Sequence, residues 1–293
     1  MPIPPASRHS RVRVLAVPAV VVLLVAACGA GRDTPAGAST GHAAATTAGK
    51  AEAMAASAGL TDPRKKDIAM RLVSSAENSS LEWQAQYGYI EDIDDGRGYT
   101  AGIIGFCSGT GDMLELVELY TAREPGNVLA KHLPALRAVD GTDSHKGLGR
   151  EFVKDWKAAA KDTAFQTAQD DERDRVYFDP AVQQAKKDGL RALGQFIYYD
   201  AFVMHGPGED AVSFGGIRET ALKKARPPAQ GGDEQAYLDA FLDARKAAMK
   251  TEEAHGDTSR VDTEQRVFLK AGNLDLNPPL SWKVYGDDYL IDE

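Results

Sequence analysis

The sequence predicts an α+β fold in which helices predominate, with one small sheet inserted early in the chain and two lobes. Two observations carry this prediction. Apolar residues recur at helical spacing over most of the chain after Gly59, whereas residues 83–106 are rich in Tyr, Ile and Gly and contain a hairpin signal. With 293 residues, of which 43% are hydrophobic and 26% charged, the chain can bury a sizeable core without disulfide or metal cross-links.

Residues 1–28 have the pattern of an export signal. Three arginines precede an apolar run, residues 14–27, which is too short to span a bilayer comfortably. The run ends in Val-Ala-Ala-Cys-Gly at residues 25–29, which resembles a bacterial lipobox, so Cys28 is a candidate for lipidation. We therefore expect a secreted protein, anchored to the outer face of the cell membrane if Cys28 is lipidated. An ordinary cleavage site with an incidental cysteine is the alternative.

Residues 29–58 are expected to form a tether that precedes a folded domain, residues 59–293. Ala, Gly, Thr or Ser occupy 23 of the 30 tether positions and none is aromatic, so the segment cannot bury enough surface to offset the entropy of ordering. If Cys28 is lipidated or removed, Cys107 is the only thiol left and no intramolecular disulfide can form.

The first predicted helix runs from Pro63 to about Glu77. Asp62 supplies the cap, Pro63 suits the first turn, and Asn78-Ser79-Ser80 ends the helix. Two or three short strands are expected within residues 83–106, broken by the turn Asp94-Asp95-Gly96-Arg97-Gly98. Further helices are predicted over residues 110–122, 126–138, 151–169, 180–204, 214–225, 234–254 and 260–271.

The charge of the folded domain excludes some partners. The chain has 34 Lys and Arg and 43 Asp and Glu; residues 1–58 contain five basic and two acidic side chains, so the remainder has 29 and 41, a net charge of −12. Such a surface repels nucleic acid and anionic lipid and attracts cationic ligands. Any membrane association is therefore expected only through Cys28.

No cofactor or metal is expected. The six histidines show no paired metal-ligand spacing, there is no Cys-x-x-Cys, and the glycines between residues 96 and 111 form neither a dinucleotide-binding nor a Walker motif.

Two candidate reaction sites follow from residue patterns. Gly105-Phe106-Cys107-Ser108-Gly109 matches a nucleophile elbow with Cys107 as nucleophile, although that elbow belongs on a larger sheet than this chain offers. Alternatively, Glu77 at the end of an apolar helix would stay protonated through partial burial, while Asp95 beside Arg97 would be ionised. A buried acid and a solvated carboxylate across a cleft are what glycosidic cleavage needs.

A family resemblance favours the carboxylates. The segment from Gly59 to Asp292 resembles the glycoside hydrolase family 46 chitosanases of soil actinobacteria. The motifs that carry the resemblance are residues 74–80 (SSAENSS), 89–93 (YIEDI), 95–100 (DGRGYT), 102–112 (GIIGFCSGTGD), 171–175 (DERDR), 204–208 (MHGPG) and 273–279 (NLDLNPP).

The resemblance implies a lysozyme-like two-lobed fold with a substrate cleft between the lobes, and endo-hydrolysis of β-1,4-linked glucosamine in chitosan with inversion. By the same resemblance, Glu77 is the general acid, Asp95 is the general base that activates water, and Thr100 helps to hold that water. Asp112 matches an acidic substrate contact.

Further roles are also carried by the resemblance alone. Asp200, Arg245 and Arg260 match a charge network behind the base, with the aspartate between two arginines. Other positions match residues that line the cleft: Asn78, Ser79, Tyr89, Arg97, Tyr177, His205 and Glu252. Gly256 stands where a relative would carry an acid, so one subsite charge is expected to be missing.

Three other functions stay open from the sequence. One is a non-catalytic, lipid-anchored protein that binds polycations, and another is a hydrolase that depends on Cys107. A lysozyme-like activity on peptidoglycan would suit the implied fold but not the acidic surface, because that substrate is not a polycation. We expect the protein to act as a monomer.

Overall fold

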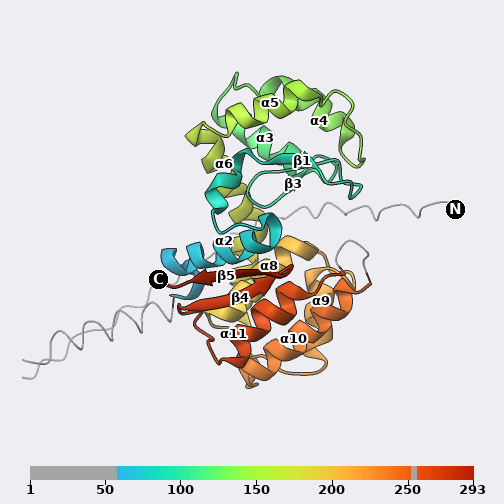
Figure 1. Ribbon diagram of the computed structural model, residues 1–293. Coiled ribbons are helices and arrows are strands. Elements are labelled where there is room, and N and C mark those ends of the chain that lie inside the picture. The colour runs from blue at the N-terminus through green and yellow to red at the C-terminus, as the bar shows by residue number, and fades with distance from the viewer. Residues whose placement is uncertain (1–57, 252–255) are drawn as a thin grey trace, which may run out of the picture. The chain divides into compact units, whose positions relative to one another are not determined.

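The computed structural model describes residues 58–251 and 256–293. These residues belong to one compact unit, and their buried apolar side chains form two separate hydrophobic clusters. Helices predominate, and the strands of this part of the chain form two small antiparallel sheets (Figure 1). The expected α+β, mainly helical, two-lobed fold is confirmed. The export signal, Cys28, the tether and Glu252 lie outside the described residues.

The larger cluster defines the large lobe, which is built around α8 (Ala192–His205). Every residue of α8 from Ala192 to Phe202 is buried, so the helix is enclosed on all sides rather than along one face. A polar residue on such a helix needs a partner inside the protein. The other α-helices that contribute to this cluster are α2 (Pro63–Asn78), α7 (Asp179–Lys187), α9 (Phe214–Leu222), α10 (Glu234–Met249) and α11 (Arg266–Lys270).

Helix α2 forms as predicted and carries Glu77 in its last turn. Asp62 Oδ1 accepts hydrogen bonds from the backbone nitrogens of Arg64 and Lys65 at 3.0 and 3.1 Å, which satisfies free donors of the first turn. The helix ends at Asn78, because Ser79 adopts a left-handed conformation with φ 49°.

A C-terminal hairpin that the sequence analysis did not predict packs against α2. Its strands are β4 (Leu280–Val284) and β5 (Asp287–Ile291), and β4 alternates buried and exposed residues. Trp282 Nε1 donates a hydrogen bond to Ser75 Oγ at 3.1 Å, and Ser75 Oγ donates to the carbonyl of Leu72 at 2.7 Å. The hairpin therefore fastens the helix that carries Glu77.

The small lobe contains the first sheet, whose strands are β1 (Ile90–Asp92), β2 (Tyr99–Ala101) and β3 (Phe106–Cys107). Strand β2 is central and pairs Thr100 with Glu91 on one side and Cys107 on the other. The predicted turn joins β1 to β2. The two or three short strands expected within residues 83–106 are confirmed, and residues 83–88, at the start of that range, form a short 3-10 helix. The lobe is completed by α3 (Asp112–Arg123), α4 (Leu133–Val139), α5 (Arg150–Ala159) and α6 (Thr163–Arg173).

Three predicted helices divide or begin late. The helix predicted over 180–204 is interrupted at Gly189, whose φ of +78° suits glycine and ends α7. The helix predicted over 151–169 divides because Asp162 caps a new one, accepting from the nitrogen of Ala164 at 2.9 Å. The helix predicted over 126–138 begins only at residue 133, since the Asn127 side chain satisfies backbone donors in the preceding turn.

Trp83 and Tyr177 join the two lobes, because both pack against both hydrophobic clusters. Tyr177 lies in the π-helix Asp174–Phe178, which connects α6 of the small lobe to α7 of the large lobe. Within residues 58–251 and 256–293, no helix has the length and apolar character needed to cross a membrane.

Candidate active site

Asp95 lies in the turn between β1 and β2 and is held by its neighbour Arg97. Asp95 Oδ1 accepts from the backbone nitrogen of Arg97 at 3.0 Å, and Oδ2 accepts from Arg97 Nε at 2.7 Å and Nη2 at 2.5 Å. The Asp95 side chain is only 12% exposed although it lies in a turn. The predicted pairing with Arg97 is confirmed, and it fixes the direction of the carboxylate.

Behind this turn, polar side chains connect β2, β3 and α3. The Thr100 hydroxyl lies 3.5 Å from the Cys107 sulfur, and the Cys107 nitrogen donates to Asp112 Oδ1 at 2.9 Å. Tyr177 OH donates to Asp112 Oδ2 at 3.3 Å. Burial raises the pKa of Asp112, and the hydrogen bonds that Asp112 accepts from Thr110, the Cys107 nitrogen and Tyr177 partly oppose the rise. Asp112 thus has a structural role within the small lobe.

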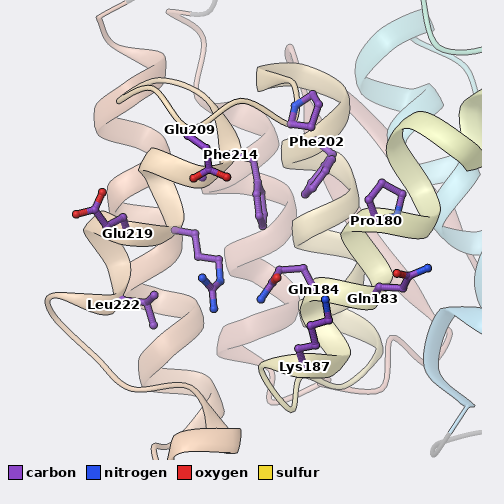
Figure 2. Close-up of a pocket in the computed structure, with 12 residues that line it drawn as sticks. Pro180, Gln183, Gln184, Lys187, Phe202, Glu209, Phe214, Glu219 and Leu222 are labelled. Carbon is purple, nitrogen blue, oxygen red and sulfur yellow. The ribbon is translucent and has the colours of Figure 1, made fainter. Parts of the chain in front are cut away.

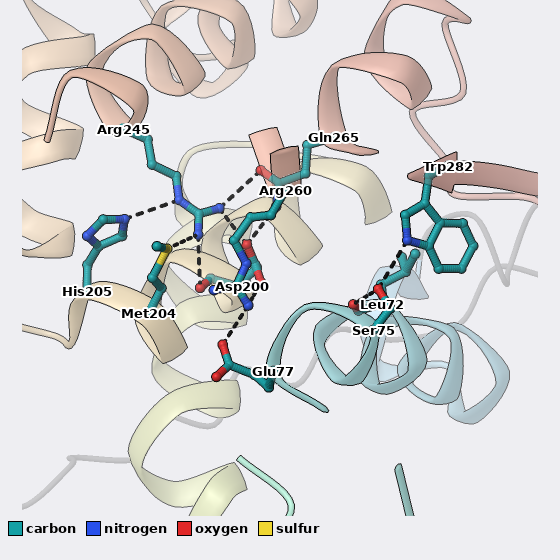
Figure 3. Close-up of polar contacts among 10 residues, drawn as sticks. All are labelled: Leu72, Ser75, Glu77, Asp200, Met204, His205, Arg245, Arg260, Gln265 and Trp282. Carbon is teal, nitrogen blue, oxygen red and sulfur yellow. Dashed lines mark hydrogen bonds and ion pairs between the residues drawn. The ribbon is translucent and has the colours of Figure 1, made fainter. Parts of the chain in front are cut away.

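Glu77 lies at the outer end of a buried charge network (Figure 3). Arg260 Nη2 donates to Glu77 Oε1 at 2.6 Å and also pairs with Asp200 Oδ1 at 3.2 Å. Asp200 Oδ2 pairs with Arg245 Nη1 at 2.5 Å. The Glu77 side chain is 25% exposed, whereas Asp200, Arg245 and Arg260 are buried. The network therefore links α2, α8 and α10 with the π-helix Arg260–Gln265.

Two expectations about this network need correction. It was expected behind the base, but it contacts Glu77, while Asp95 is held by Arg97 in its own turn. Glu77 was expected in apolar surroundings, but an arginine lies against its carboxylate. The reason is long-range packing, because Arg260 is 183 residues away in the sequence and reaches α2 only through the fold.

Arg97 connects the two candidate carboxylates electrostatically. Burial would lower the pKa of Arg97, but the Coulomb effects of Cys107, Asp95 and Glu77, with the hydrogen bond to Asp95, raise it above its ordinary value. Asp95 and Glu77, which belong to different lobes, therefore both act on one guanidinium group.

The Asp200 carboxylate is the centre of the network. Burial alone would raise the pKa of Asp200, but the charges of Arg245 and Arg260 hold it below its ordinary value. Gln265 Nε2 donates to Asp200 Oδ2 at 2.7 Å, which uses a further lone pair. A buried aspartate with two arginines and an amide is fully compensated, whereas removal of one partner would leave a buried charge.

The remaining predicted contact residues come from several elements of both lobes. Asn78 and Ser79 directly follow Glu77, and Tyr89 precedes β1, where its hydroxyl donates to Glu91 at 3.3 Å. His205 ends α8 and accepts from Arg245 Nε at 3.3 Å, so it joins the buried network. Gly256 is exposed.

Sequence reasoning missed three residues of the network. Gln265 bonds Asp200 and Arg245, the Met204 sulfur accepts from Arg245 Nη2 at 3.3 Å, and Glu264 is buried beside them. Glu264 and Gln265 follow Val261 and precede Phe268 at helical spacing. Two polar residues on a predicted apolar stripe are a signal that could have revealed a buried polar network.

A pocket of about 410 Å³ lies elsewhere on the large lobe, between α7, the end of α8 and α9 (Figure 2). Its walls include Gln183, Phe202, Glu209 and Phe214, and neither Glu77 nor Asp95 lines it. Across the described ranges, no group of His, Cys, Asp or Glu side chains is arranged to hold a metal ion.

Comparison with known proteins identifies the family. The sequence model of glycosyl hydrolase family 46 matches residues 71–280. The chain belongs to glycosyl hydrolase family 46. This hydrolase is 78% identical over 239 residues to a chitosanase of a Streptomyces species, in a match that covers 82% of this chain and 86% of that protein. It is 70% identical over 256 residues to a chitosanase of a Nocardioides species, covering 87% and 91% of the two proteins.

The fold of this family 46 hydrolase also matches that of solved relatives. A chitosanase structure described as a co-crystal with substrate is 63% identical, with a TM-score of 0.79. The match covers 80% of this chain and 99% of that one. The expected lysozyme-like architecture of the family is confirmed, and the protein is a glycoside hydrolase.

Cys107 does not have the environment of a nucleophile. Its side chain is 1% exposed, its sulfur donates to the carbonyl of Gly105 at 3.2 Å, and burial, then the charge of Asp112, raises its pKa to about 11. A reactive cysteine needs an accessible, stabilised thiolate. The residue is a small buried hydrophobe between β2 and α3.

We predict that native Cys107 resists alkylation. A pKa raised from 9.0 to about 11 lowers the thiolate fraction about 100-fold at mildly alkaline pH, and burial slows access further. In a Cys28→Ala variant, which leaves Cys107 as the single thiol, iodoacetamide labelling should be slow in buffer and rapid in urea. Fast labelling of the folded protein with parallel loss of hydrolysis would contradict this and revive the thiol mechanism.

Proposed function

We propose that this hydrolase cleaves the β-1,4-glycosidic bonds of chitosan, attacking within the chain. The observation that carries the proposal is the identity of 70% and more to two chitosanases over most of their length. The excess of acidic side chains supports it, because chitosan is a polycation in mildly acidic water and is attracted by a negative surface. The same attraction weakens as salt screens it.

The proposed reaction is a single displacement with inversion. Glu77 gives its proton to the leaving glycosidic oxygen, while Asp95 takes a proton from the water whose oxygen bonds to the anomeric carbon. The origin of the two carboxylates in different lobes supports the assignment, since substrate can lie between them. Inversion needs about 6.5 to 9.5 Å between the carboxyl groups, so that water fits.

Neighbouring side chains have supporting roles in this proposal. Arg97 orients Asp95 through hydrogen bonds at 2.7 and 3.0 Å, and the Thr100 hydroxyl on the adjacent strand helps to hold the water. Asp112 provides an acidic contact for the cationic sugar, and Tyr177, whose hydroxyl donates to Asp112, lines the cleft beside it. The flanking contacts would come from Asn78, Ser79, Tyr89, His205 and Glu252.

We also propose that residues 1–28 direct export and that Cys28 anchors the protein to the outer face of the membrane through residues 29–58. The apolar run and the lipobox-like sequence support this location, where a polysaccharide substrate is accessible. We propose that the enzyme acts as a monomer. Membership of a hydrolase family favours catalysis over polycation binding alone.

The substrate prediction is that the protein releases reducing sugars from chitosan, with little release from chitin or peptidoglycan. The reason is charge, because only chitosan is a polycation. Reducing ends would be measured on chitosans of graded acetylation at low and high salt, with viscosity recorded in parallel. Endo-cleavage should lower viscosity before much sugar appears. Equal activity on peptidoglycan, or chitosan binding without any release, would contradict the assignment.

The residue prediction is that Glu77→Gln and Asp95→Asn each reduce kcat by at least about 100-fold, the usual contribution of general acid or base catalysis. Both substitutions keep the size of the side chain, although the amide of Asp95→Asn can accept hydrogen bonds from Arg97 through its oxygen alone. Circular dichroism and thermal unfolding should therefore show a folded protein. Glu82→Gln, an exposed position close in sequence, is the matched control and should keep wild-type rates. A Glu77→Gln variant with wild-type kcat would remove Glu77 from the acid role.

The stereochemical prediction is that the first product carries the α-anomer. A single displacement by water inverts the anomeric carbon, whereas a covalent intermediate retains it. Proton NMR of the anomeric region, recorded in the first minutes before mutarotation, would distinguish the two. A β-anomer as first product would exclude the inverting mechanism.

A further inference from the structure

Glu264 is a buried carboxyl group that the mechanism described above does not use. It lies in the π-helix Arg260–Gln265 and is 1% exposed. Neither of its carboxyl oxygens has a hydrogen-bond partner. A buried polar group without a partner is costly and rare in folded proteins. Its location beside the network that reaches Glu77 calls for a specific explanation.

The same turn contains a donor that is also unpaired. Arg260 uses Nη2 to bond Glu77 Oε1 and to pair with Asp200 Oδ1, but its Nε has no hydrogen-bond partner. Arg260 and Glu264 are four residues apart in one helix, a spacing that puts two side chains on the same face. Arg260 therefore pairs with Glu77 and Asp200 through Nη2, while Glu264, on the same face of the helix, is a further carboxyl group whose oxygens have no partner.

The charges of the network do not balance without one of these carboxyl groups. Arg245 and Arg260 bring two positive charges, and Asp200 brings one negative charge. An ionised Glu77 brings the net charge of the network to zero. General acid catalysis, however, requires Glu77 to carry a proton, and the network is then left with one uncompensated buried cation, which is strongly unfavourable.

We propose that Glu264 is the second counter-ion of Arg260, ionised when Glu77 is protonated and protonated when Glu77 is ionised. When Glu77 takes up a proton from solvent, Glu264 releases one to solvent, so the net charge of the network stays at zero. After Glu77 has given its proton to the leaving oxygen, both changes reverse. Glu264 thus acts as a positioning residue through Arg260. This inference rests on the proposed role of Glu77 as general acid.

The surroundings of Glu264 suit such a switch. Burial, then the negative charge of Asp200, raise the pKa of Glu264 well above its usual range, while Arg260 and Arg245 oppose the rise. In the structure Glu77 is paired to Arg260, and the raised pKa of Glu264 favours its protonated form. Other groups that face the network are His205, which bonds Arg245, and Tyr285, which acts on Arg260 from the turn between β4 and β5. Arg97 of the small lobe interacts electrostatically with Glu77.

The first test is the pH dependence of Glu264→Gln. Without a second counter-ion, Arg260 can be compensated only by an ionised Glu77, so the acid loses its proton at lower pH. The alkaline limb of the kcat profile should shift by about one pH unit to lower pH, which is a loss of about tenfold on that limb. KM should stay within about twofold, because Glu264 does not touch substrate.

Two further variants separate this effect from a structural one. Asp262→Asn changes another carboxyl group of the same π-helix, one that pairs with Lys246 at 2.5 Å, and should leave the limb in place. Glu264→Asp keeps a carboxyl group, so its alkaline limb should lie between the limbs of Glu264→Gln and the wild type. A Glu264→Gln profile that superimposes on the wild type, or one that falls equally at every pH, would overturn the proposal.

The second test reads the proton directly and does not depend on activity. In protein labelled with carbon-13 at the glutamate carboxyl groups, Glu264 should give a protonated signal near neutral pH. The signal is assigned by its loss in Glu264→Gln or, if that variant does not fold, by its loss in Glu264→Asp, since an aspartate carries no labelled glutamate carboxyl group. In Glu77→Gln, which imitates a protonated acid, the Glu264 signal should move to the ionised position. Glu118→Gln is the control. Glu118 lies on α3 of the small lobe, away from the network, so this substitution should leave the Glu264 signal unmoved.

The outcomes distinguish this inference from the proposed function. If Glu77→Gln is inactive but Glu264 stays protonated in it, the counter-ion proposal fails and the role of Glu77 stands. If Glu77→Gln hydrolyses chitosan at the wild-type rate, Glu77 is not the acid, and both proposals fail.

Discussion

The ion pairs between Asp200, Arg245 and Arg260 are the interaction on which the catalytic side of the large lobe depends. Three charged side chains are buried there, at 1%, 0% and 3% exposure, and each would be strongly unfavourable alone. Together they connect α8, α10 and the π-helix Arg260–Gln265, and through Arg260 they reach Glu77 on α2. The position of the candidate acid is therefore set by charge balance inside the lobe as much as by apolar packing.

The two candidate carboxylates are held by different means. Asp95 is fixed locally, since its partner Arg97 is two residues away in the same turn, and the glycines of that turn permit its backbone conformation. Glu77 is fixed at long range, by an arginine from the other end of the chain and by a hairpin whose Trp282 bonds Ser75 on α2. A partner that is close in sequence, such as Arg97, can be predicted from the neighbouring residues, whereas a distant partner such as Arg260 depends on the whole fold.

The same difference explains which structural predictions succeeded. Helix α2 formed as predicted because its cap, proline and apolar stripe are local signals. The helix expected over 180–204 divides at Gly189, where Asp188 is buried and accepts hydrogen bonds from Arg218 and Tyr198, partners that lie elsewhere in the lobe. The hairpin β4–β5 was missed although Leu280, Trp282 and Val284 alternate with polar residues in the sequence. A run of five residues does not by itself indicate a strand until the surface against which it packs is known.

The sequence by itself determined the class of the molecule, its acidic surface, the Asp95–Arg97 turn and, through long motifs, the family and the candidate carboxylates. Only the tertiary structure decided which of the two candidate carboxylates the charge network supports. It placed Arg260 against Glu77 rather than behind Asp95, and it buried Glu264 without a hydrogen bond beside Arg260. The physical reason is that the pairing of buried charges depends on which side chains the packed helices bring within a few ångströms, and sequence spacing does not contain that distance.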